Sequence, residues 1–306
     1  MEMARPPSTP PGPQRLDTDL AQWRERLDAH GDIHGYHRIL DSRHGALFTE
    51  DDDILLVSFE PAEQMRAGPT GLPAALGVAG RAGWSQLCLY CEGDSFFRAE
   101  AVFEFFDELV DTGFFDQFEH VVFTGAGPCG YAAASYSVTA PGASVVLIRP
   151  LATLDSARAG WDHRYPALRR TDFTRRYGYA PEMLEAAGAA FILYDPEMPA
   201  DAIHASLFNL PPENLFQCRH FGPALEGDLA KMGILDPLIL AAGRVKLDAA
   251  AFHRLFRKRR DYRPYLHRVL NHLRSEKRAG LCRLWANGIR AQLAPEAPKK
   301  AASGRG

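Results

Sequence analysis

The chain has 306 residues, of which 46% are hydrophobic and 24% charged, a composition typical of one or two globular domains. The formal net charge is only −3, which argues against a protein that binds nucleic acid over its whole surface. The charge is uneven, because residues 1–250 carry a net −15, residues 251–290 a net +10 and the last sixteen residues a net +2. The sequence therefore predicts an acidic body followed by a basic segment.

Several classes of protein are excluded by simple patterns. No run of about 18 apolar residues is present, so no membrane span is expected, and the Pro-rich N-terminus lacks the apolar region of a secretory signal. Five scattered cysteines, an odd number, favour a reducing, cytoplasmic setting over a disulfide framework. Cys88 and Cys91 form a C-x-x-C, but on an apolar strand they would face opposite sides, so no metal or redox role is predicted.

In chain order, residues 1–14 and 294–306 are rich in Pro, Ala, Gly and charge, and we expect disordered tails there. Apolar strands then alternate with helical patterns up to residue 247. The expected strands are 46–49, 54–59, 85–91, 120–124, 144–148, 189–194 and 214–218. This alternation predicts an α/β domain over 15–247, with a mostly parallel sheet between two layers of helices.

One predicted helix covers residues 99–112 and ends before Gly113. Its spacing predicts a single apolar face, formed by Val102, Phe105, Phe106, Leu109 and Val110.

Residues 151–188 show no strand pattern and are dense in Arg, Tyr and Trp. We expect a cap insertion over the carboxyl edge of the sheet, where such folds bind ligands. Two interpretations remain open for its arginines: they bind an anionic or sugar-like ligand, or they pair with the acidic body.

The segment 121–133, V-V-F-T-G-A-G-P-C-G-Y-A-A, predicts a strand, a tight turn and the start of a helix. One chemistry that uses such a turn is the G-x-G-x-x-G loop of dinucleotide-binding proteins, which Gly125, Gly127 and Gly130 satisfy literally. Arg149, at the end of the next strand, would then meet a 2′-phosphate of an NADP-like nucleotide. Against this interpretation, at least two strands precede the loop, whereas that fingerprint usually opens its domain.

The other chemistry is the nucleophile elbow, G-x-S-x-G. The strand ends at Thr124, and Pro128 is suited to the first helical position, so residue 127 occupies the nucleophile position. That residue is Gly127, which has no side chain to attack with. Cys129 follows in the first helical turn, where a helix N-terminus favours a thiolate.

Read with its flanking strands, this turn resembles the elbow of the α/β-hydrolase fold, of the type G-x-S-x-G-G-Y-A-A, with Gly127 in place of the serine. The resemblance covers roughly residues 45–240. It implies an acid after a late strand, which is Asp195 or, as a second candidate, Asp201, and then a histidine, which is His220.

The sequence, with its hydrolase-like core and altered elbow, is similar to a family of alphaproteobacterial proteins. The resemblance implies no established activity for that family. Some relatives carry the name phosphoadenosine phosphosulfate reductase. That chemistry is not expected here, because neither an S-G-G-x-D-S phosphate loop nor an E-C-G-x-H tail occurs in the sequence.

The resulting expectation is an α/β-hydrolase-like three-layer protein that lacks its serine nucleophile. We expect a pseudoenzyme that binds a small ligand or a protein partner, without a cofactor or metal. One alternative is an active esterase that uses Cys129 with His220 as its base. The other is nucleotide binding through Gly125, Gly127 and Gly130.

Residues 248–293 predict basic amphipathic helices. We expect their apolar face to dock on the core and their basic face to meet acidic groups of this chain or of a second subunit. The alternative is an external protein or anionic partner.

Overall fold

The computed structural model describes residues 13–293, with side chains from Leu20 to Ile289. The expected tails fall outside this range except at residues 13–14, which already belong to helix α1 (Pro13–His34). Among the described helices, none has both the length and the apolar character that a membrane crossing requires.

The core is an eight-stranded sheet with the strand order β1-β2-β4-β3-β5-β6-β7-β8. The strands are β1 (Gly35–Ile39), β2 (His44–Thr49), β3 (Asp52–Pro61), β4 (Trp84–Cys91), β5 (His120–Ala126), β6 (Ser144–Ile148), β7 (Ala189–Tyr194) and β8 (Leu215–Gln217). β2 runs antiparallel to both of its neighbours, and the pairs from β4 to β8 are all parallel. The carboxyl ends of the parallel strands therefore meet at one edge.

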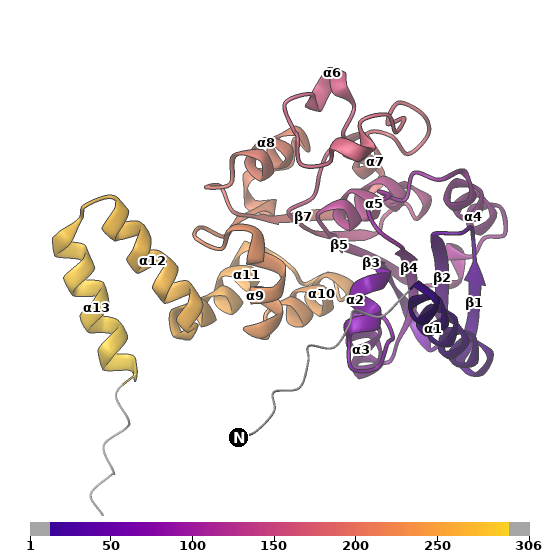
Figure 1. Cartoon of the computed structure of the whole chain (residues 1–306), viewed down its shortest axis with the longest axis horizontal. Helices are drawn as coiled ribbons and strands as arrows, with labels where there is room; N and C mark the ends of the chain where they lie inside the picture. Colours follow the sequence, from indigo (N-terminus) through magenta and orange to yellow (C-terminus); the bar gives the residue numbers. More distant parts are fainter. Residues whose placement is uncertain (1–12, 294–306) are drawn as a thin grey trace, which may run out of the picture.

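Helices cover both faces of this sheet (Figure 1). The helices before the C-terminal segment are α2 (Ala62–Ala67), α3 (Ala74–Ala82), α4 (Glu100–Asp111), α5 (Pro128–Tyr136), α6 (Ser156–Ala159), α7 (Ala180–Met183), α8 (Pro199–Leu207), α9 (Leu225–Lys231) and α10 (Leu235–Gly243). One core cluster joins the sheet to α4, α5 and α8, and another joins its opposite face to α3, α9 and α10. This three-layer arrangement confirms the predicted fold class.

Side-chain alternation along the strands explains why both faces are apolar. In β3, Leu55 and Val57 pack in the α4–α5 layer, whereas Leu56 packs in the opposite layer. Cys88 and Cys91 also lie on opposite faces, as expected, because Cys88 packs beneath α1 and Cys91 packs on the α4 side.

Helix α4 differs from its predicted apolar face at one position. Val110 is 48% exposed, while Phe103, which was not assigned to the buried face, is only 2% exposed. Phe103 is covered because the ring of Tyr177, from the insertion, lies 5.9 Å from its own ring.

The insertion after β6 contains α6 and α7 and packs against α5, where the Tyr131 hydroxyl donates to the backbone oxygens of Tyr177 and Gly178. Its arginines contact carboxylates of this same chain: Arg164 pairs with Asp201 at 2.6 Å and Arg176 with Glu100 at 2.8 Å. These contacts favour the interpretation in which the insertion's arginines pair with the acidic body.

The C-terminal segment has two parts. Helix α11 (Ala249–Phe256) is built into the core, because Phe252 is fully buried and stacks on Phe216 with ring centroids 4.2 Å apart. Helices α12 (Arg263–Ser275) and α13 (Ala279–Leu293) form a hairpin that extends away from the sheet (Figure 1). In the structure, α11 thus packs with the body, and the hairpin begins after the short turn that follows α11.

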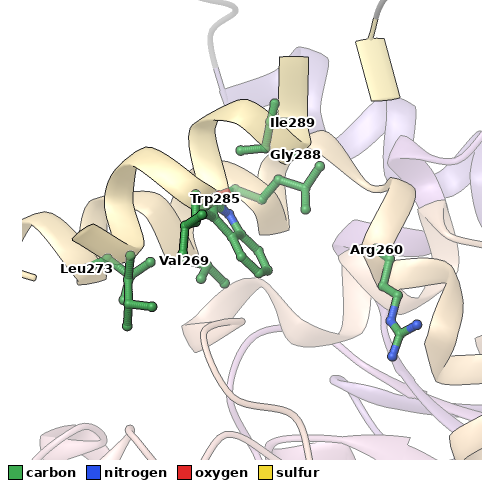
Figure 2. A pocket seen from close by; sticks show the side chains of 9 residues that line it. Arg260, Val269, Leu273, Trp285, Gly288 and Ile289 are labelled. Carbon is green, nitrogen blue, oxygen red and sulfur yellow. Dashed lines mark hydrogen bonds between the residues drawn. The ribbon is translucent and has the colours of Figure 1, made fainter. Parts of the chain in front are cut away.

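An apolar hollow of about 690 Å³ lies between α12 and α13 (Figure 2). Val269 and Leu273 line it from α12, and Trp285 and Ile289 line it from α13. Trp285 ties the two helices together, because its Nε1–H donates to the Leu266 backbone oxygen at 3.0 Å. The apolar faces of α12 and α13 therefore lie mainly against each other.

Candidate functional site

A sharp turn, called the elbow from here on, joins β5 to α5. Helix α5 begins at Pro128, and Gly127 before it has φ 55° and ψ −122°. A Cβ built on Gly127 would meet no atom within 4 Å, so this position faces open space. Residue 127 therefore faces open space at the tip of this turn and carries no reacting group.

The neighbouring glycines are required by close packing. A Cβ on Gly125 would lie 2.3 Å from the backbone oxygen of Cys129, and one on Gly130 would lie 3.2 Å from the Cα of Pro150. Both positions hold the strand and the helix close together, which accounts for them without a bound phosphate.

Pro128 removes a second catalytic feature. In α/β-hydrolase elbows, the backbone N–H of the residue after the nucleophile donates to the oxyanion of the tetrahedral intermediate. Proline has no backbone N–H. This turn therefore offers neither a nucleophilic side chain at residue 127 nor a backbone N–H at residue 128.

Cys129 is 5% exposed at the start of α5. Burial, followed by the nearby Cys91 and Glu226, raises the pKa of the Cys129 thiol well above its ordinary value. The effect of burial on the Cys129 pKa outweighs that of the helix N-terminus, which we expected to favour a thiolate. The sulfur is therefore a protonated thiol near neutral pH, and it lacks the nucleophilic form that the esterase alternative needs.

Asp195 and His220 follow β7 and β8, at the positions that the resemblance implies. Asp195 is 1% exposed, and its carboxylate accepts the backbone N–H groups of Glu197, Phe221 and Gly222 at 2.7–2.9 Å. The acid thus fixes the loop around His220 rather than the imidazole itself. The buried Asp195 carboxylate therefore acts as an acceptor for hydrogen bonds from the backbone.

His220 points to a different partner. Its Nδ1 lies 2.8 Å from Glu197 Oε2, and its ring lies 4.7 Å from that of His272 on α12. It does not line the pocket that contains Gly127 and Cys129. The structure therefore brings Gly127 and Cys129 together at the elbow but leaves His220 and Asp195 outside that pocket.

The second acid candidate, Asp201, is also engaged elsewhere. It is 2% exposed and accepts from Arg149 at 2.9 Å and from Arg164 at 2.6 Å. Arg149 additionally donates to the backbone oxygen of Pro223. This arginine is therefore held by protein groups, which weakens the expectation that it meets a nucleotide phosphate.

A pocket of about 430 Å³ opens at the elbow, a size typical of small-ligand sites. It is formed by the elbow, the end of β3, the β4–α4 loop, the insertion and α9. Its lining residues are Pro61, Glu63, Gln64, Cys91, Gly93, Asp94, Ser95, Phe96, Phe97, Ala126, Gly127, Pro128, Cys129, Arg149, Tyr165 and Glu226.

The charges in this pocket are mainly acidic. Glu63, Asp94 and Glu226 line it, against the single cation Arg149. Glu226 has no hydrogen-bond or ion-pair partner among the described residues, and burial, then nearby Glu60, raises the pKa of its carboxyl group. Such a lining opposes the phosphates of a dinucleotide and favours a ligand that donates hydrogen bonds.

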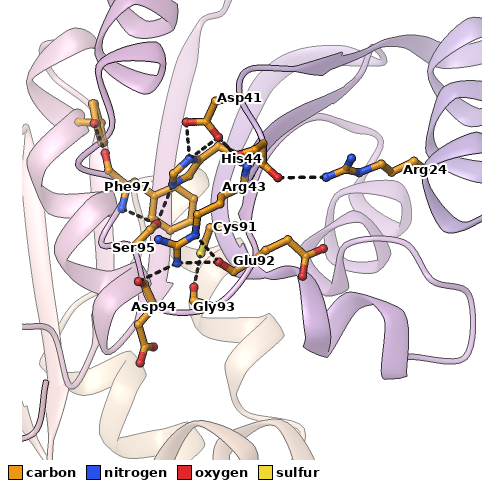
Figure 3. Close-up of polar contacts among 12 residues, drawn as sticks. Arg24, Asp41, Arg43, His44, Cys91, Glu92, Gly93, Asp94, Ser95 and Phe97 are labelled. Carbon is orange, nitrogen blue, oxygen red and sulfur yellow. Dashed lines mark hydrogen bonds and ion pairs between the residues drawn. The ribbon is translucent and has the colours of Figure 1, made fainter. Parts of the chain in front are cut away.

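A polar array of Asp41, His44 and Ser95, which no motif in the sequence marks, reaches this pocket through Ser95 (Figure 3). His44, at the start of β2, contacts the Asp41 carboxylate through Nδ1 at 2.9 Å and Ser95 Oγ through Nε2 at 2.7 Å. Because Asp41 accepts the Nδ1 proton, Nε2 is left to accept from the serine hydroxyl. Burial lowers the pKa of His44, so its imidazole is neutral near pH 7.

The residues that carry this array give a weak pattern in the sequence. The sequence around Asp41 and His44 is typical of a turn. Ser95 lies 51 residues after His44 and directly follows a Gly-Asp pair. The antiparallel pairing of His44 with Cys91 brings them together. Arg43 also joins the two segments, because its guanidinium donates to the backbone oxygens of Glu92 and Asp94.

No family model and no curated protein matches the sequence. Among solved structures, a carboxylesterase of Nitrososphaera gargenis is 12% identical with a TM-score of 0.43, over 67% of this chain and 97% of that one. A lipase/esterase of Lactobacillus plantarum is 13% identical with a TM-score of 0.38, over 65% and 98%.

A glycosylation-associated Gap123 complex of Streptococcus agalactiae gives 14% identity and a TM-score of 0.43, over 62% of this chain. The match spans less than half, 44%, of that longer chain. With TM-scores below 0.5, these likenesses say nothing about the activity of this protein.

Proposed function

We propose that this protein binds a small polar ligand in the elbow pocket and does not transfer acyl groups from the elbow. The observation that carries the proposal is Gly127, which occupies the nucleophile position with open space in front of it. Pro128 behind it supplies no N–H for an oxyanion. What remains of the site is a concave, polar cavity that no longer holds the parts of a serine hydrolase.

The chemistry of the ligand follows from the unpaired acid in the pocket. An unpartnered carboxylate in a partly buried site is costly unless a donor meets it. Glu226 therefore favours a ligand with an amino or hydroxyl group, and the Tyr165 ring, which also lines the pocket, offers a flat surface for a sugar or a short carbon chain. We assign the ligand to small amines, amino sugars or polyols.

A panel of small amines, amino sugars and polyols tests this assignment by thermal shift on the full-length protein. We expect one class to raise the Tm by a few degrees at millimolar concentration. Glu226→Gln removes the acceptor charge and should weaken binding about tenfold, whereas Glu213→Gln, outside the pocket, should leave it unchanged. A panel with no shift, or equal shifts for wild type and Glu226→Gln, contradicts the proposal.

A second function is favoured by the contact between Ser95 and His44. Asp41, His44 and Ser95 have the polarity of a catalytic triad, which is defined by geometry rather than by chain order. Phe96 and Phe97 after the serine have φ of 54° and 56°, although both are fully buried aromatic residues. Backbone strain of this kind clusters at functional sites.

In this second function, Ser95 Oγ attacks the carbonyl carbon of an ester and His44 Nε2 accepts the hydroxyl proton. His44 then returns that proton to the departing alcohol, leaving an acyl group on Ser95. A water molecule repeats the two steps and releases the acid. Ser95 lies on the pocket wall, so a ligand in the elbow pocket would sit beside it.

Labelling by a fluorophosphonate probe separates the two functions. If Ser95 is a nucleophile, the wild type is labelled, Ser95→Ala is not, and Cys129→Ala keeps the label. If the protein only binds its ligand, none of the three is labelled. Gly127→Ser should gain no label in either case, because Pro128 and the distant His220 leave an introduced serine unactivated. A labelled serine at 127 would overturn the account of the elbow.

A further inference from the structure

We infer that Glu197, His220 and His272 form a binding site for a divalent transition metal, of which Zn²⁺ fits best, and that this metal fastens helix α12 to the body. One potential ligand atom from each residue lies within 4.8 Å of the other two. Among the side chains described, those of residues 20–289, this is the one group of three or more His, Cys, Asp and Glu with such spacing.

The three donors come from separate parts of the fold. Glu197 follows β7, His220 follows β8, and His272 lies in the third turn of α12. A metal bound by all three would connect two loops at the edge of the sheet with the hairpin that extends from it. Such a site exists only in the folded chain, so binding the metal stabilises the folded state.

Asp195 holds two of the donors in place. Its buried carboxylate accepts the backbone N–H of Glu197 at 2.9 Å and those of Phe221 and Gly222 at 2.8 Å and 2.7 Å. The backbone on both sides of the Glu197–His220 pair is therefore fixed by one side chain. Asp195 therefore fixes the two loop segments from which the Glu197 and His220 side chains extend.

Arg268 places the third donor. Its Nε–H donates to the His220 backbone oxygen at 2.7 Å, and its second nitrogen pairs with Asp228. Arg268 and His272 are four residues apart on α12, so their side chains lie on the same helix face. The contact that docks α12 against the His220 loop therefore also directs His272 toward His220.

His220 is held in an uncommon backbone conformation, with φ 68°. A non-glycine residue in this region costs about 1 kcal/mol or more and persists only where the surroundings impose it. Here the contacts of Asp195 and Arg268 impose it, and the imidazole is directed to Glu197 and His272 as a result.

The donor set selects the metal. Two imidazoles and one carboxylate, with a fourth position open to water, form the zinc site of several hydrolases, whereas Mg²⁺ and Ca²⁺ prefer oxygen ligands alone. Ligand bonds of about 2.0–2.1 Å in a tetrahedral site separate donor atoms by roughly 3.3 Å. The 2.8 Å contact of His220 with Glu197 and the 4.8 Å limit for the group bracket that separation.

Titration of the untagged, metal-free, full-length protein with ZnCl₂ tests the inference. We expect one Zn²⁺ per chain, a higher Tm with Zn²⁺, and no such effect with Mg²⁺. Replacing Zn²⁺ by Co²⁺ should give the visible ligand-field absorption of a four-coordinate site. His272→Ala should weaken binding at least about tenfold and remove the Tm gain.

The matched control is His267→Ala, an exposed histidine on the same helix outside the cluster. It should bind Zn²⁺ like the wild type. His272 is itself exposed, so its variant should fold, and circular dichroism verifies this. Zn²⁺ binding that is absent, or that is equal in His272→Ala and wild type, overturns the inference. Neither result affects ligand binding at the elbow pocket, which these residues do not line.

Discussion

At the scale of single residues, the site is defined by what each side chain is already bound to. Asp195 is occupied by backbone N–H groups, Arg149 by Asp201, and His220 by Glu197. Glu226 is the partly buried charged residue of the elbow pocket whose side chain has no partner among the described residues, and Asp94, whose carboxylate is also unpaired, is exposed. A group that is left unsatisfied in a cavity is a better guide to ligand chemistry than one that matches a motif.

Cysteine reactivity gives a direct test at this scale. Cys88, Cys91, Cys129 and Cys218 are buried, and burial raises the pKa of each thiol, that of Cys91 to about 11. Cys282 on α13 is partly exposed. A disulfide reagent such as DTNB at pH 8 should therefore modify one thiol rapidly in the native protein and five after unfolding.

Cys282→Ser should abolish the rapid phase, and Cys129→Ser should leave it intact. Rapid loss of the Cys129 thiol in the native protein would revive the esterase alternative that uses this residue with His220.

At the scale of elements, the C-terminal helices differ in how they are attached. Helix α11 contributes Phe252 and Phe256 to the core cluster. The buried residues of α12, Leu266, Val269 and Leu270, lie outside the three core clusters, and Leu266 and Val269 line the hollow that faces α13. The hairpin is thus an appendage, whereas α11 is part of the body.

Two truncations distinguish these attachments. Ending the chain after Asp261 should leave a folded body with a modestly lower Tm, since only the contacts of α12 with the body are lost. Ending it after Leu247 also removes two buried phenylalanines, which costs roughly 3–6 kcal/mol and approaches the whole stability of a typical domain.

Urea unfolding followed by circular dichroism measures both truncations. Equal stability of the two shortened chains would show that α11 contributes nothing to the core.

At the scale of the whole molecule, the opposite charges of the body and the C-terminal segment meet at few points. Among side chains in the described range 20–289, Arg268 with Asp228 is the single ion pair between α11–α13 and the body. Apolar packing of α11, stacking of Tyr265 on Phe221, and the contacts of Arg268 with Asp228 and the His220 backbone oxygen therefore attach the segment. Most of its positive charge faces solvent, where a partner of opposite charge could meet it.

The sequence by itself determined the features that depend on local chemistry. Apolar periodicity gave strands such as 144–148 and 189–194 with the observed bounds, and the place of Pro128 gave the start of α5 and put Gly127 at the elbow. These are set by backbone preferences of neighbouring residues, which the sequence contains.

The tertiary structure alone decided which side chains meet. His44 reaches Ser95 because β2 pairs with β4, and His220 turns to Glu197 and His272 because α12 docks through Arg268 and the backbone at His220 has a positive φ. Position after a strand predicts where a residue lies along the sheet edge. It does not predict the direction of the side chain, which is set by contacts between segments that are distant in the chain.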